Sequence, residues 1–293
     1  MDFDSFLSQA WDEHATDAAG VAERLATQGP DRVTEEAQIA PLGNLVHHVY
    51  GQHLGRWAEG SALLQRLAAH PACSAGGAAG AALARMQASL ALCAGTADER
   101  AAMPVSERLR VSALAAANLT EHDTARAAAL LSGALSEAEG AGLEAADPAN
   151  RAMAVAANNM AATLEEKAER SASERELMIA AAQAGRRYWA LAGTWLEIER
   201  AEYRLAMTWL QAGDAAQARH HAQQCLAIVQ EHDGAPLEVF FGNEALALAE
   251  RARGNLAGHA EAVAQAQQAF ARLDEGDRGW CQSTLDKLQS ATP

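Results

Sequence analysis

The chain has 293 residues, of which 49% are apolar but only 5% aromatic, and 23 Lys and Arg residues against 38 Asp and Glu residues give a net charge of −15. A chain of this length can bury a substantial core, as one elongated domain or as two packed lobes. A surface this acidic repels phosphate backbones and anionic lipids, which disfavours general binding of nucleic acids or membrane surfaces. Val and Ile are scarce and no stretch alternates cleanly with β-branched residues, so the composition predicts an all-α fold.

The cysteine pattern and the N-terminal sequence favour a reducing compartment. Cys73, Cys93, Cys225 and Cys281 are widely spaced and form no Cys-x-x-Cys pair. The first six residues are acidic where a signal peptide would be basic, and no apolar run approaches the roughly 18 residues that a membrane span needs. The sequence therefore predicts a cytoplasmic protein with no membrane partner.

Proline and glycine interrupt the first half of the chain at intervals that suit helical hairpins. A first helix is expected to carry the apolar residues from Phe3 to Leu25 and to end at Gly29-Pro30. The Ala- and Gly-rich stretch 74–80 is expected to be a loose connector. A second helix is predicted to end near residue 53. The other helices predicted in this half cover about 58–69, 81–94, 106–119 and 124–139.

The second half carries clearer helix signals. Asp147-Pro148 opens a helix that continues through Leu164. The stretch from Ser171 to Glu174 is a capping box, in which the serine accepts an orphan backbone N–H and the glutamate reaches back. Further helices are predicted at about 194–211, from the turn at 213–214 to about 230, at 237–252 and 256–272, with a terminal capping helix at 274–288.

An internal repeat is the most specific signal in the sequence. The stretches 159–164 and 204–209 each place a large apolar residue before an Ala and another one three positions after that Ala. Gly213-Asp214 and Gly254-Asn255 are 41 residues apart. Each unit is therefore long enough for two helices and a turn.

These residues resemble the tetratricopeptide repeat family. The best unit consists of Leu205-Ala206, Trp209, Gly213-Asp214, Ala218, Ala222 and Cys225-Leu226, and a second match begins at Gly55-Arg56-Trp57. The resemblance implies an α-α superhelix of about 5–6 helical hairpins in a single elongated domain. Its expected parts are an N-terminal capping region (1–40), the repeats (41–272) and a C-terminal capping segment (273–293). A generic α-solenoid without repeat homology is the alternative.

Three histidines near residue 50 raise the question of a metal site. Two ligands on one face of an α-helix need the spacing i and i+4, or a Glu-x-x-His pattern. His47, His48 and His53 have spacings of five and six instead. His220 and His221 are adjacent, and adjacent side chains point about 100° apart on a helix. The spacing therefore predicts no metal site. These histidines are expected to lie on the polar surface or to line a groove.

No pattern for catalysis or for a cofactor is found. Neither Lys167 nor Lys287 follows a glycine-rich turn, which excludes a P-loop, and no Gly-x-Ser-x-Gly elbow occurs. The paired carboxylates Glu165-Glu166 and Glu197-x-Glu199 are expected to belong to solvated helix faces. The sequence predicts a non-enzymatic protein with no catalytic residues and no cofactor.

A concave groove is expected where the resemblance is strongest. In the resembled family, residues four apart on the inner face of each first helix line this groove. Tyr203 falls at such a position, whereas Trp209 falls at a packing position, and both lysines lie elsewhere, so the family's lysine-based carboxylate clamp is not reproduced. The predicted groove residues are Asn158, Ala162, Glu165, Glu166, Arg200, Tyr203, Met207, Leu210 and Gln211.

The expected function is that of a scaffold or interaction module that binds a peptide or protein segment in this groove. One alternative is a regulatory sensor whose repeat pocket binds a peptide or a small ligand. A second alternative is a self-associating homo-oligomer, such as a homodimer formed through exposed Ala-rich faces. Nothing in the sequence names the partner.

Overall fold

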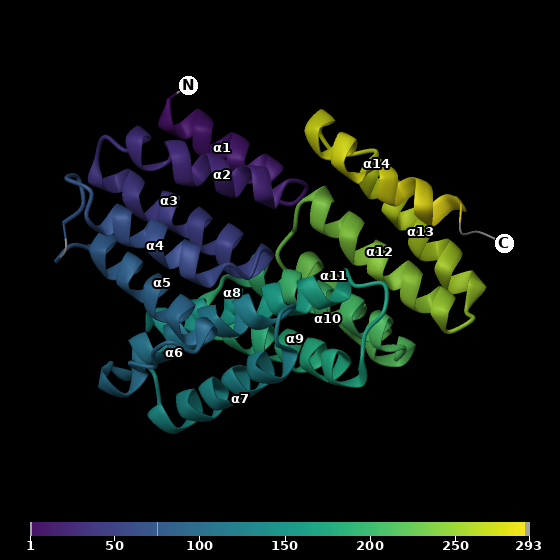
Figure 1. The fold of residues 1–293 in the computed structure, drawn as a ribbon. Coiled ribbons are helices and arrows are strands. Elements are labelled where there is room, and N and C mark those ends of the chain that lie inside the picture. Colours follow the sequence, from purple (N-terminus) through teal and green to yellow (C-terminus); the bar gives the residue numbers. More distant parts are fainter. Residues whose placement is uncertain (1, 75, 291–293) are drawn as a thin grey trace. The chain divides into compact units, whose positions relative to one another are not determined.

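The structure is a computed structural model that describes residues 2–74 and 76–290. Within these ranges it is 80% helical and contains no strand, and successive helices pack in adjacent pairs (Figure 1). The prediction of an all-α fold made of helical hairpins is confirmed. Among the described residues, none of the helices has the length and the apolar character that a bilayer span requires.

The chain divides into two compact units, Met1–Ala156 and Ala157–Pro293, and the boundary between them falls inside helix α8 (Pro148–Glu165). The α-helices of the N-terminal unit are α1 (Phe3–Glu13), α2 (Ala18–Gln28), α3 (Ile39–Val46), α4 (Trp57–Ala68), α5 (Ala78–Ala94), α6 (Val105–Leu119) and α7 (Thr124–Ala141). Those of the C-terminal unit are α9 (Ala172–Ala192), α10 (Trp195–Ala212), α11 (Ala215–Glu231), α12 (Pro236–Ala252), α13 (Leu256–Phe270) and α14 (Glu275–Ser290). The single continuous repeat domain expected from the sequence stays a prediction.

The core of the N-terminal unit gathers apolar side chains from the first helices. Leu42, Leu45 and Val46 follow the i, i+3, i+4 spacing that places side chains on one face of α3, and all three are buried. They pack in one cluster with side chains of α1, α2, α4 and α5, of which Leu25 and Leu64 are fully buried. This shared core fixes the positions of the N-terminal helices against one another.

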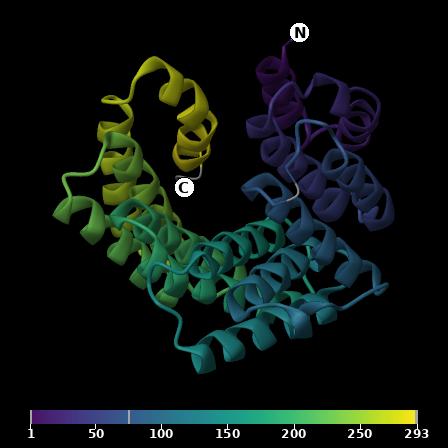
Figure 2. The ribbon, with the colours of Figure 1, turned by 90° about the vertical axis from the view of Figure 1, so that its left-hand side faces the viewer.

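Small side chains join the helices α10, α11 and α12 of the C-terminal unit. Ala206 of α10, Ala222 of α11 and Ala245 of α12 are fully buried against one another. A methyl group allows two helix backbones to approach closely, so these contacts set α10, α11 and α12 side by side. Helix α14 packs against α12 and α13 at the end of this unit, the yellow part of Figures 1 and 2.

Most helix limits agree with the sequence patterns to within a few residues, with two corrections. The expected first helix is two helices, because the Asp17 side chain accepts the Gly20 N–H and caps a new helix start. The expected connector 74–80 is shorter, because α5 already begins at Ala78. The predicted capping box of Ser171 with Glu174 is confirmed at the start of α9.

The helix expected to end near residue 53 changes its geometry on the way. After Val46 the chain continues as a π-helix, His47–His53, in which Leu54 N–H donates to the carbonyl of Val49, five residues earlier. The carbonyl groups in the last turn of a helix have no partner within the helix, and here they accept hydrogen bonds from side chains outside it. The Trp57 indole N–H donates to the Gly51 carbonyl at 3.1 Å, and His122 Nε2 lies 2.8 Å from the Gln52 carbonyl.

Candidate binding groove

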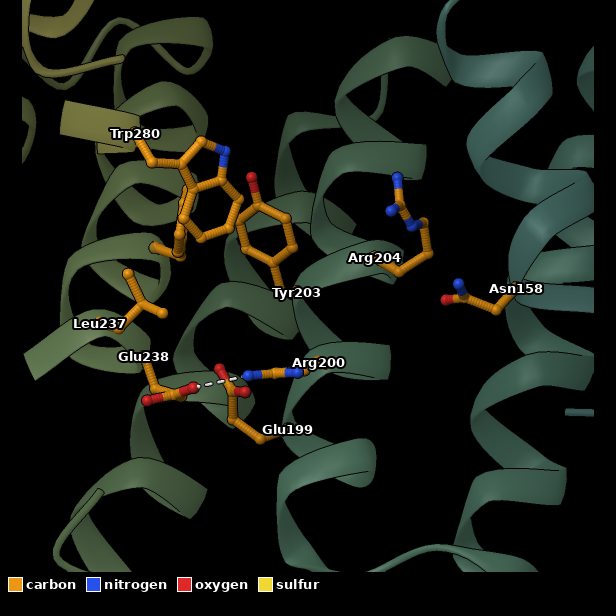
Figure 3. Close-up of a pocket in the computed structure, with 9 residues that line it drawn as sticks. Asn158, Glu199, Arg200, Tyr203, Arg204, Leu237, Glu238 and Trp280 are labelled. Carbon is orange, nitrogen blue, oxygen red and sulfur yellow. Dashed lines mark hydrogen bonds and ion pairs between the residues drawn. The ribbon is translucent and has the colours of Figure 1, made fainter. Parts of the chain in front are cut away.

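A cavity of about 380 Å³ opens on the C-terminal unit between α8, α10, α12 and α14 (Figure 3). Helices α10 and α12 form most of its wall, because they pack directly on each other. The residues that line the cavity are Asn158, Glu199, Arg200, Tyr203, Arg204, Leu237, Glu238, Phe241 and Trp280.

Helix α10 supplies the largest share of this wall. A second capping box fixes its start: the Thr194 side chain accepts the Leu196 N–H, and Glu197 accepts the Thr194 N–H at 2.8 Å. From this start, side chains four positions apart fall on one side of the helix, and the neighbouring row of side chains lies about 100° further around it. That spacing places Glu199 and Tyr203, and beside them Arg200 and Arg204, along the cavity.

One side of the cavity is aromatic. The Tyr203 ring meets Phe241 edge to face at a centroid distance of 5.7 Å, and Phe241 in turn lies 5.1 Å from Trp280. The Tyr203 hydroxyl donates to the Glu244 carboxylate at 3.0 Å, and burial with that neighbouring carboxylate raises the pKa of Tyr203. Trp280 is 65% exposed, so α14 flanks the cavity with a large apolar surface that is open to solvent.

One helical turn before Tyr203, the cavity holds a buried carboxyl group. Glu199 is almost fully inaccessible, and its Oε1 accepts a hydrogen bond from the Cys225 thiol at 2.8 Å. Its Oε2 has no hydrogen-bond partner among the described residues. Burial, and to a smaller extent the negative charge of Glu238, raises the pKa of Glu199 to about 7, although the Cys225 hydrogen bond opposes this. Near neutral pH this group can therefore donate a hydrogen bond as well as accept one.

Two arginines of α10 are held by carboxylates. Arg200 forms an ion pair with Glu238 of α12 at 3.0 Å, yet 60% of its side chain remains exposed (Figure 3). Arg204 pairs with Glu165 of α8, which also accepts a hydrogen bond from the Thr208 hydroxyl. Arg200 thus presents donors to solvent at the cavity rim, whereas Arg204 links α10 to α8.

Three of the nine predicted groove residues line this cavity: Asn158, Arg200 and Tyr203. The six others lie elsewhere in the unit. Glu165 forms an ion pair with Arg204, and Gln211 accepts a hydrogen bond from Arg170 at 2.6 Å. Met207 packs on the buried alanine cluster. Ala162 and Leu210 are half-buried, and Glu166 is exposed.

The sequence pattern missed six lining residues, and two of its interpretations were wrong. Glu197-x-Glu199 is not a solvated pair, because Glu197 caps α10 and Glu199 is buried. Glu165 is likewise held in an ion pair between helices, while only Glu166 matches the expected exposed position. Phe241 and Trp280 stood out as aromatic residues in the sequence, but their distance along the chain gave no sign that they share a wall with Tyr203.

The fold and this cavity define the chain as an all-α protein of helical hairpins with an amphipathic groove in its C-terminal unit. Comparison with known proteins finds no matching family model and no significant match among curated proteins.

Proposed function

We propose that this chain is a non-enzymatic interaction module, related to tetratricopeptide repeats, that binds a peptide or protein segment in the groove of its C-terminal unit. The cytoplasm is the proposed compartment, as the reduced-cysteine pattern suggests. The partner segment places an apolar or aromatic side chain against the exposed aromatic wall and a hydrogen-bonding group near Glu199.

The observation that carries this proposal is the pairing of an exposed tryptophan with an unpartnered buried oxygen in one cavity. Trp280 is 65% exposed, and Trp is among the residues that contribute most to binding energy in protein interfaces. Glu199 Oε2 is buried and has no partner within the part of the chain that the structure describes, and an unmet buried polar group costs on the order of 1–3 kcal/mol. A ligand that covers Trp280 removes apolar surface from water, and a hydrogen bond from the same ligand to Glu199 satisfies the buried oxygen.

A small-molecule sensor is the second candidate, because of the size of the cavity. Its volume of about 380 Å³ lies within the range typical of small-ligand sites. The same aromatic wall and buried carboxyl group suit a compact ligand with an apolar ring and a hydrogen-bond donor. If such a ligand displaces a bound peptide, both bind in this cavity and not elsewhere on the surface.

The test is selection of peptides from a displayed random library on the wild-type protein, followed by measurement of their affinities by fluorescence polarisation. Trp280→Ala is expected to weaken Kd more than about 10-fold, since loss of an aromatic anchor removes a dominant contact. Arg200→Ala is expected to weaken Kd less, because that side chain is largely solvated and already paired with Glu238.

Leu256→Ala is the matched control, because Leu256 is another exposed apolar residue of the same unit, 54% accessible, and lies outside the cavity. Its affinity for the selected peptides should equal that of the wild type. If the Trp280→Ala and Arg200→Ala variants bind every selected peptide as tightly as the wild type, the groove is not the binding site.

A further inference from the structure

Three histidine side chains from two distant segments converge in the N-terminal unit. His14 follows α1, and His48 and His53 belong to the π-helix. Their ring centroids lie 4.9 Å apart for His14 and His48, 5.1 Å for His14 and His53, and 4.6 Å for His48 and His53. One ring nitrogen of each lies within 4.8 Å of the others, and all three residues are only partly buried.

The π-helix is what brings His48 and His53 together. In an α-helix, side chains five positions apart point in clearly different directions. In the π-helix the hydrogen bond runs from residue i to i+5, so residues with this spacing are stacked along one face. His48 Nε2 and His53 Nε2 accordingly lie 3.0 Å apart. A spacing of five residues separates two side chains only on an α-helix, and this segment is a π-helix.

His14 completes the group with a fixed ring orientation. Its Nδ1 donates a hydrogen bond to the carbonyl of Trp11, because a carbonyl oxygen can only accept. The proton is therefore on Nδ1, and Nε2 carries the free lone pair. A backbone carbonyl that holds the other ring nitrogen is the usual support of a metal-binding histidine. The Trp11 ring packs over the same group, 5.1 Å from His14 and 5.3 Å from His48.

The π-helix is itself anchored, so the two histidines it carries are held in place. The Tyr50 hydroxyl donates to the Ala22 carbonyl of α2 at 2.8 Å, and the adjacent Arg56 N–H donates to the Tyr50 carbonyl at 2.8 Å. His47 points to the other side, where its Nε2 lies 2.7 Å from Ser89 Oγ. His48 and His53 therefore lie on a different face of the π-helix from His47, and this is the face that His14 contacts.

We propose that His14, His48 and His53 form a binding site for a divalent transition-metal ion of the zinc type. Three imidazoles with no carboxylate suit Zn²⁺, Cu²⁺ or Ni²⁺ and not Mg²⁺ or Ca²⁺. Nitrogens at about 2.0–2.1 Å from a tetrahedral Zn²⁺ stand roughly 3.3 Å apart, so His48 and His53 already have nearly this separation and His14 needs a shift on the order of 1 Å.

The coordination sphere has room for an outside ligand. No fourth His, Cys, Asp or Glu side chain belongs to the group among the described residues. A three-histidine set with an open fourth position binds water or another small donor there. The site therefore holds a metal ion that stays accessible to solvent, in contrast to a closed structural zinc site.

The test is a titration of the untagged, chelator-treated protein with ZnSO₄, followed by isothermal calorimetry, and a parallel titration with CuSO₄, followed by tryptophan fluorescence. We expect one equivalent of Zn²⁺ to bind and to raise Tm. We expect Cu²⁺ to quench a part of the emission that is missing in a Trp11→Phe variant, because Trp11 is the indole that touches the histidines.

His14→Asn and His53→Gln are expected to weaken Zn²⁺ binding at least about 100-fold, since loss of a ligand costs more than loss of its outer-shell support. His220→Ala, an exposed histidine of the other unit, is the matched control and should bind as the wild type does. Circular dichroism of each variant with chelator present checks that the helices are intact. No binding to the wild type, or equal binding by the wild type and the double variant His14→Asn/His53→Gln, would overturn the site.

Discussion

Glu199 shows how a single buried carboxyl group can couple this fold to pH. Its pKa is about 7 in the folded protein, against an ordinary value of 4.5, because burial disfavours the charged form. Between these two values the native state binds more protons than the unfolded state. The free energy of unfolding that Glu199 contributes therefore falls as pH rises from 4.5 to about 7.

Glu199→Gln is expected to remove this pH dependence. One pKa unit corresponds to about 1.4 kcal/mol, so the variant should gain on the order of 3 kcal/mol relative to the wild type between pH 4.5 and pH 8. Urea unfolding of both proteins at these two pH values measures the difference. Glu166→Gln, at an exposed position, is the control. A constant difference between the wild type and Glu199→Gln would show that folding does not raise the pKa of Glu199.

Among the secondary-structure elements, the π-helix depends on a close tertiary contact at Gly51. A Cβ atom on Gly51 would lie 2.8 Å from the Asn118 Nδ2, which is too close for ordinary contact. Asn118 cannot move freely, because it is buried and its Nδ2 lies 3.0 Å from His47 Nε2. The backbone at Gly51 and the side chain of Asn118 therefore fit only in the absence of a Cβ atom.

Gly51→Ala is expected to lower the free energy of unfolding by roughly 1–3 kcal/mol, the cost typical of overpacking a core. Gly133→Ala is a matched helical control in α7, because a Cβ atom there meets no other atom within 4 Å. That variant should be neutral or up to about 1 kcal/mol more stable, since alanine favours the helix over glycine. Equal effects of the two substitutions in chemical denaturation would contradict the tight contact at Gly51.

At the scale of the whole molecule, the two proposed sites lie in different compact units. The histidine group belongs to Met1–Ala156 and the groove to Ala157–Pro293. In helical-repeat proteins stability is close to a sum of local terms, because each hairpin contacts chiefly its neighbours. A ligand bound to one unit is therefore expected to stabilise the helices next to its site most.

Hydrogen exchange followed by mass spectrometry tests this locality. Saturating Zn²⁺ is expected to slow exchange in residues 3–56 and to leave residues 195–290 unchanged. A groove peptide selected on the wild-type protein is expected to produce the reverse pattern. Uniform slowing over the whole chain by either ligand would mean that the molecule opens as one cooperative unit.

The helices and turns could be predicted because they depend on neighbours in sequence. Helix starts at capping boxes such as Ser171 with Glu174, and the glycine at the end of α10, follow from local hydrogen bonds and from the φ of +86° that Gly213 adopts. The alternation of bulky residues with Ala206 likewise indicated close helix packing. These features are determined by residues a few positions apart.

The sites depended on the tertiary structure. Trp280 and Tyr203 share a cavity because α10 and α14 both pack against α12, and the buried Glu199 meets Cys225 of the next helix. His14 and His48 come together from segments more than thirty residues apart in the sequence. No local sequence pattern predicted the π-helix that carries His48. By itself the sequence determined an all-α chain of hairpins; side-chain burial and long-range contacts decided which residues gather into sites.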